Sequence, residues 1–162
     1  MGKGGFPPEI KTFNWTDYKA IVEEQYQIFC NDFITSTVMF QGKPIVIKPQ
    51  PTTDGKEDCF WHVVSRDFDG SGTRDADGQR VARVHWLRAI VENFDHPTVT
   101  YFTYQTAKGR YRHYFWLKES SYLLILEEGA KRYYIVTAYI VDKKYMIEDL
   151  TKRAAAYVLR IK

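Results

Sequence analysis

Apolar residues recur at helical spacing in three stretches of the chain. The first predicts a helix at about 17–33, and Thr16 just before it is a typical N-cap residue. The second predicts a helix at about 79–94, and the third predicts a helix at about 143–158. A shorter aromatic stretch at 57–66 favours a short helix over a strand.

The second half of the chain carries runs rich in β-branched and aromatic residues, which are typical of strands. Four such runs follow one another with short connections, which predicts an antiparallel meander. These runs are residues 99–104, 111–117, 122–127 and 133–141. One earlier short strand is expected at 44–48, closed by prolines. The pattern predicts an α+β fold with a C-terminal helix.

The length of 162 residues fits a single domain, 1–162, with a Gly- and Pro-rich arm at 1–13. No apolar h-region opens the chain and no run approaches 18 apolar residues, so neither a signal peptide nor a membrane span is expected. The two cysteines, Cys30 and Cys59, lack metal-site spacing. We therefore expect reduced thiols and a cytoplasmic location.

Charge is unevenly distributed although the net charge is only +3. Residues 1–59 carry six Lys against eight Asp and Glu, whereas residues 78–118 carry seven Lys and Arg against Glu92 and Asp95. A local surplus of cations suits a polyanion, and it also suits an ordinary solvated face. The aromatic content of 16% has two readings as well, a sheet core packed with rings or a face that stacks bases.

The loop at 67–78 resembles an EF-hand calcium loop at positions 1, 3, 5 and 6. Position 12 should be a bidentate glutamate and is Gly78, so we expect a polar surface loop instead. The chain contains no P-loop, no G-x-G-x-x-G, no G-x-S-x-G and no histidine pair with zinc spacing. No metal and no cofactor are therefore expected.

His62 and Thr137 are the residues from which chemistry could come. An imidazole near neutral pH can both accept and donate a proton. His62 sits in an aromatic segment, where a packed core histidine is the ordinary alternative. If alternation holds in the last strand, Thr137 lies on one face with Tyr133, Ile135 and Tyr139, and Val136 and Ala138 lie on the other. A threonine in a strand is more often only a β-former.

The order of these segments is similar to the phage-associated branch of the barnase–EndoU–colicin–RelE nuclease superfamily. The residues that carry the resemblance are Trp61-His62, Arg74 to Arg80 running into Arg83 to Leu87, Tyr114 to Trp116, Tyr122 to Glu127, and Tyr133 to Tyr139. The likeness covers roughly 44–150. One departure is Ala76, where the phage branch often has proline in the Arg-containing loop.

The resemblance implies N-terminal helices packed on a four-stranded antiparallel sheet, with RNA held between them. It also implies a toxin-type endoribonuclease that cleaves without metal and leaves a 2′,3′-cyclic phosphate. His62 would be the general acid and base, Arg80 or Arg83 would neutralise the phosphorane, and Thr137 would orient the phosphate. The groove would be lined by Arg66, Arg74, Arg112, Trp116 and Tyr139.

The expected partners are RNA, including tRNA, and an antitoxin or immunity protein. Two alternatives stay open. The first is a non-catalytic module for nucleic acid, or for phage or mobile-element interactions, on the same fold. It would keep the arginines and the aromatic residues and would not depend on His62. The second is a structural or protein-binding domain, in which the aromatic residues are core and the charges face solvent.

Overall fold

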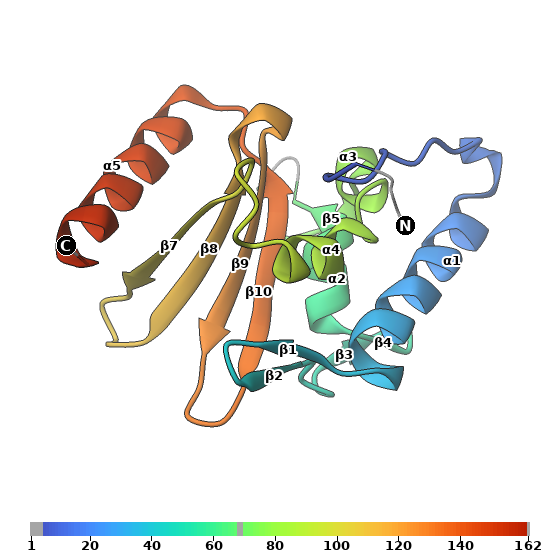
Figure 1. The fold of residues 1–162 in the computed structure, drawn as a ribbon. Helices are drawn as coiled ribbons and strands as arrows, with labels where there is room; N and C mark the ends of the chain where they lie inside the picture. The colour runs from blue at the N-terminus through green and yellow to red at the C-terminus, as the bar shows by residue number, and fades with distance from the viewer. Residues whose placement is uncertain (1–4, 68–69, 162) are drawn as a thin grey trace.

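A computed structural model describes residues 5–67 and 70–161. Helices pack on both faces of a mixed β-sheet, so the protein is α+β as expected (Figure 1). The helices are α1 (Tyr18–Cys30), α2 (Asp58–Val64), α3 (Gly78–Val81), α4 (Trp86–Glu92) and α5 (Lys144–Ile161). Single helical turns lie at Trp15–Asp17, Asn31–Thr35 and Lys118–Ser120.

The strands form one large sheet and two small ribbons. The large sheet has the order β1-β2-β10-β9-β8-β7, and the ribbons pair β3 with β4 and β5 with β6. The strands of the large sheet are β1 (Val38–Phe40), β2 (Lys43–Val46), β7 (Thr100–Gln105), β8 (Tyr111–Leu117), β9 (Tyr122–Glu128) and β10 (Tyr133–Ile140). The ribbon strands are β3 (Thr52–Thr53), β4 (Lys56–Glu57), β5 (Ser65–Arg66) and β6 (Asp75–Ala76). The predicted meander is confirmed as β7 to β10, which pair antiparallel in chain order.

The expectation of a four-stranded sheet is wrong, because the sheet has six strands. β2 pairs in parallel with the start of β10, and β1 folds back on β2. Gln41 and Gly42 connect β1 to β2 with φ of 46° and 85°, which is the left-handed pair that a tight hairpin turn requires. A strand of three residues is too short to show a clear alternating pattern, so it is not recognised in the sequence without its partner.

The helix expected at 79–94 divides into α3 and α4. Between them the N–H of Arg83 bonds to the carbonyl of Arg80, and the N–H of Trp86 bonds to that of Arg83. The physical reason is burial, since four consecutive residues, 81–84, are buried. A regular surface helix turns part of every four residues to solvent, so it cannot bury all of them.

The start of α1 also differs from expectation. The carboxylate of Asp17, not the hydroxyl of Thr16, caps the helix by accepting the N–H of Ala20 at 3.1 Å. Asn14 caps the preceding turn through the N–H of Thr16. The first helix therefore begins one residue later than the sequence pattern predicts, which is a usual size of error for a helix end.

Two hydrophobic cores lie on opposite faces of the sheet. The larger core holds α1, α2 and α4 against the sheet and includes Phe29, Phe60, Leu87 and Phe115. The smaller core lies under α5, which stands apart from the other helices on the β7 side (Figure 1). The expected helix at 143–158 is confirmed as α5. Across the described residues, no helix is long and apolar enough to cross a membrane.

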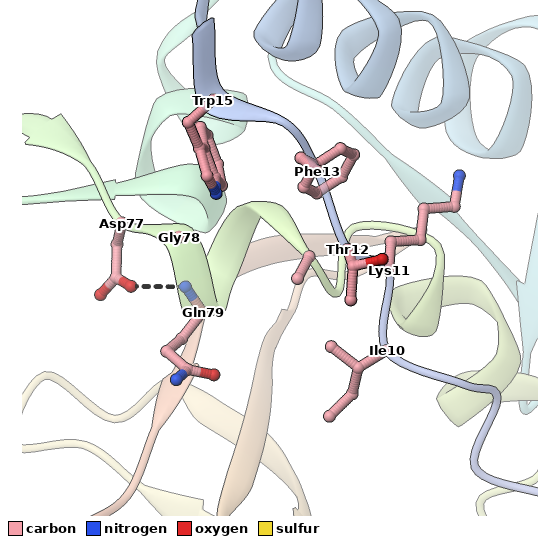
Figure 2. Close-up of a pocket in the computed structure, with 9 residues that line it drawn as sticks. Ile10, Lys11, Thr12, Phe13, Trp15, Asp77, Gly78 and Gln79 are labelled. Atoms are coloured by element: carbon pink, nitrogen blue, oxygen red, sulfur yellow. Dashed lines mark hydrogen bonds between the residues drawn. The ribbon is translucent and has the colours of Figure 1, made fainter.

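The N-terminal segment from residue 5 onward lies against α3 and the turn after it. Lys11 donates its N–H to the carbonyl of Ala82 at 3.3 Å, and the ring of His85 donates to the carbonyl of Glu9 at 2.8 Å. A hollow of about 570 Å³ lies beside Trp15 and Gln79 (Figure 2). Its lining is mostly apolar, with Lys11 and Asp77 as the ionisable members, so it offers little acid–base chemistry.

Candidate functional site

β10 has an unpaired edge beside α2. β2 pairs with β10 only at Tyr133 and Tyr134, while β9 pairs with β10 along its whole length on the other side. Among the described residues, no strand pairs with this edge after Tyr134, and α2 and α3 contact β10 (Figure 1). Side chains from a helix and a strand therefore meet there with room between them.

A β-bulge shapes this edge of the sheet. Ile135 pairs with Leu126 and Thr137 pairs with Ile125, so Val136 is an extra residue in β10. The predicted strict alternation is therefore wrong. Tyr133, Ile135 and Ala138 pack in the larger core, whereas Val136 and Tyr139 pack toward α5. Bulges redirect side chains in this way and are frequent next to functional sites.

α2 carries His62 to the same place. The expectation of a helix at 57–66 is confirmed, and the hydroxyl of Thr137 donates to the carbonyl of His62 at 3.3 Å. The imidazole stays 42% exposed, and its Nε2 lies 3.3 Å from Oδ2 of Asp58, one helical turn earlier. The sequence reading missed Asp58, although the (i, i+4) spacing within a helix was the available signal.

A groove of about 590 Å³ opens beside these residues. It brings together six residues that the sequence singled out: His62, Arg66, Arg74, Arg80, Thr137 and Tyr139. It adds Lys143 and the exposed Tyr145 from the entry to α5, neither of which had any motif around it. Its ionisable lining comprises four Lys or Arg residues, Asp67, Asp142 and His62. The cations outnumber the carboxylates, which suits an anionic ligand.

The ribbon β5–β6 holds the arginines of the groove. Pairing of Ser65 with Ala76 closes the loop between them, and Arg74 then donates from Nε to the hydroxyl of Ser65 at 3.1 Å and from Nη2 to its carbonyl. Arg80 donates from one Nη to the carbonyls of His62 and Ser65, both at 2.8 Å. The guanidinium groups are thereby fixed near the end of α2.

Asp77 is the buried counter-charge of this cluster. Its Oδ2 lies 3.7 Å from Nε of Arg80 and 3.8 Å from Nε of Arg66. Burial lowers the pKa of Arg80 from its ordinary value, with Asp77 opposing the shift. An arginine stays charged under such a shift, because its ordinary pKa is far above neutral. Arg80 also lies over the ring of Tyr139, 5.6 Å from its centroid.

Three of the predicted site residues lie elsewhere. Arg83 is 6% exposed, donates to the carbonyl and side-chain oxygen of Gln79, and packs on Trp86. Trp116 is buried in the smaller core under α5. Arg112 pairs with Glu127 at 3.2 Å and lines a neighbouring hollow that also contains His62. The structure therefore brings neither Arg83 nor Trp116 to the groove.

The loop that resembles a calcium site is arranged around Asp67. The carboxylate of Asp67 accepts the backbone N–H groups of Gly70, Ser71 and Gly72 at 2.8, 3.1 and 2.6 Å. Asp69, the third position of the calcium pattern, lies outside the described residues. Within the described part of the chain, no group of three or more His, Cys, Asp or Glu residues is placed to hold a metal ion.

Comparison with known proteins adds no further assignment. No family model matches the chain, and no curated protein or solved structure matches it.

Proposed function

We propose that this protein is a metal-independent endoribonuclease whose groove beside α2 binds RNA. The observation that carries the proposal is the meeting of His62 and Thr137 with three arginines in one groove. These residues come from α2, β10 and the segment around the β5–β6 ribbon, so their proximity is a property of the fold. The expected toxin role and the antitoxin or immunity partner rest on the resemblance alone.

RNA cleavage of this kind uses a nucleophile that the substrate supplies. The 2′-oxygen attacks the adjacent phosphorus, the bond from phosphorus to the 5′-oxygen breaks, and a 2′,3′-cyclic phosphate remains. A base must take the proton of the 2′-hydroxyl, and an acid must give a proton to the departing 5′-oxygen. His62 is assigned the removal of the 2′-proton, because its imidazole is partly exposed in the groove, and the departing 5′-oxygen on the far side of phosphorus takes its proton from water.

The arginines are assigned to the charge on phosphorus. One guanidinium group can donate to two phosphate oxygens at once. Because the protein already holds these groups in place, they need not rearrange when negative charge develops on the phosphate. Arg80 takes this role in place of Arg83, because Arg83 is buried away from the groove. Thr137 is assigned to orient the phosphate through its hydroxyl, which must first turn away from the carbonyl of His62 that it now donates to at 3.3 Å. Asp58 is a positioning residue, since its carboxylate lies against the ring of His62.

A second candidate function is a groove that binds nucleic acid without cleaving it. The hydroxyl of Thr137 and one Nη of Arg80 both donate to the carbonyl of His62. These contacts anchor the end of α2 to β10 and α3, and they do so whether or not His62 reacts. In this alternative the arginines still bind phosphates, and RNA affinity falls steeply as salt rises.

The test is incubation of the purified protein with total RNA and with labelled tRNA in excess EDTA, beside His62→Ala. We expect the wild type to cleave and to leave cyclic phosphate ends, and we expect the variant to bind RNA but not to cleave it. Binding with no cleavage by the wild type would favour the second candidate. Neither binding nor cleavage, with the fold intact, would reject both.

A further inference from the structure

A second hollow opens on the other side of His62. Its volume is about 320 Å³, and it shares both His62 and Val136 with the groove. The two openings therefore flank one ridge, formed by the end of α2 and the bulge in β10. Both volumes lie within the range that small organic ligands occupy in proteins.

The second hollow differs from the groove in chemistry. Its charges balance, with Lys48 and Arg112 against Asp58 and Glu127. Arg112 already pairs with Glu127, whose pKa is lowered because hydrogen bonds from its two arginine partners outweigh the effect of burial. The wall includes the aromatic ring of Tyr134. A balanced, partly aromatic hollow suits a nucleobase better than it suits a phosphate.

Resting on the proposed function, we propose that this second hollow binds a nucleobase next to the scissile phosphate, stacked on Tyr134. A single RNA strand then crosses the ridge at His62, with its phosphates in the groove and one base in the second hollow. The geometry of the reaction is compatible with such a path. The attacking and departing oxygens lie on opposite sides of phosphorus, so the two flanking nucleotides extend in opposite directions from it.

Lys48 occupies the place where the base would stack. Its ammonium lies 4.9 Å from the centroid of the Tyr134 ring, and the side chain is exposed. A lysine on a flexible four-carbon stem can leave the half-buried ring of Tyr134 and follow the phosphate of the nucleotide that replaces it. Every base has a π-face, so a stacking site of this kind tolerates many sequences.

The experiment measures binding and not cleavage. The probe is a fluorescein-labelled single-stranded RNA with 2′-O-methyl groups throughout, which removes the nucleophile. Its affinity is measured by anisotropy for the wild type, Tyr134→Leu and Tyr134→Phe. The double variant Arg66→Ala/Lys143→Ala reports on the groove, and Tyr18→Leu is the control at an exposed tyrosine on α1. Thermal melting shows which variants are folded.

Tyr134→Leu keeps an apolar side chain but removes the ring, so we expect roughly five- to a hundred-fold weaker binding, the range that loss of one stacked base gives. Tyr134→Phe and Tyr18→Leu should bind like the wild type. The proposal is overturned if Tyr134→Leu binds like the wild type, or if Tyr134→Phe is weakened as much as Tyr134→Leu. If only the groove variant loses affinity, RNA binding in the groove stands and the second hollow has no part in it. If the wild type does not bind the probe, the proposed function fails as well.

Discussion

His62 and His113 each lie against a carboxylate, and the rest of their surroundings differ. His62 is 42% exposed at the unpaired edge of β10, with Asp58 at 3.3 Å. His113 is 4% exposed inside the sheet, on β8. Its Nε2 lies 2.7 Å from Glu128, and its Nδ1 lies 2.6 Å from the hydroxyl of Tyr101. Both ring nitrogens of His113 are therefore used within the protein.

The surroundings of His113 favour its neutral form. Burial lowers the pKa of His113 from its ordinary value, although Glu128 opposes the shift. The neutral ring then donates from Nε2 to Glu128 and accepts at Nδ1 from Tyr101. Lys43 completes the chain with an ion pair to Glu128 at 2.8 Å. A histidine–carboxylate pair alone therefore does not mark a candidate catalytic histidine, and what separates these two is the exposure of the ring.

The largest expected effect separates the two histidines by activity. His62→Gln should slow RNA cleavage by about 10²- to 10⁴-fold, the usual contribution of a general acid or base. His113→Phe should keep the wild-type rate per folded molecule to within a few-fold. Single-turnover cleavage in EDTA, normalised to the folded fraction, measures both. A wild-type rate in His62→Gln would remove His62 from the mechanism.

The second largest expected effect is on stability, and it also distinguishes His113 from His62. His113→Phe retains a ring of similar size but leaves Tyr101 and one oxygen of Glu128 without their partner. We expect a loss of about 2 kcal/mol in the free energy of unfolding, a usual consequence of stranding partly buried polar groups. His62→Ala should change it by less than about 0.5 kcal/mol, as at other surface positions. Urea unfolding of both variants gives the comparison, and equal losses would contradict the contrast.

The smallest effect is in the pH dependence of stability. The pKa of His113 is lowered in the folded state, so the unfolded chain binds this proton first, near pH 6.5. Stability is therefore full above that pH and falls as the pH drops below it, by at most about 1.4 kcal/mol per pH unit for one proton. The pKa of His85 is also lowered by burial and adds to the same slope.

Urea unfolding at a series of pH values between 5.5 and 8 measures that slope. We expect the slope to be smaller in His113→Phe than in the wild type. If the slope is the same in His113→Phe as in the wild type, the imidazole of His113 in the wild type titrates as it does in the unfolded chain.

The sequence pattern predicted the parts of the fold that depend on local periodicity. The meander, α2 and α5 were all expected from residue spacing, and the structure confirms them. The missed parts depend on distant partners. β1 is three residues long, and the pairing of β2 with β10 joins segments far apart in the chain. The bulge at Val136 could not be expected either, since alternation is the default for a strand.

The sequence predicted which types of residue line the groove better than it predicted which individual residues lie there. Histidine and arginine chemistry pointed to His62 and Arg80, and both line the groove. Arg83 was expected to contact the phosphorane, but it lies buried at the break between α3 and α4. Lys143 joins the groove only because the chain enters α5 there. No local pattern marks such a residue.

The most direct test of the account is cleavage of one labelled RNA by the wild-type protein in excess EDTA, beside the same RNA with 2′-deoxyribose at the cut position. We predict that the all-RNA strand is cut there and ends in a 2′,3′-cyclic phosphate, and that the 2′-deoxy strand is not cut at that position. Equal cleavage of both strands, or a 3′-hydroxyl end, would contradict a mechanism in which the RNA supplies the nucleophile.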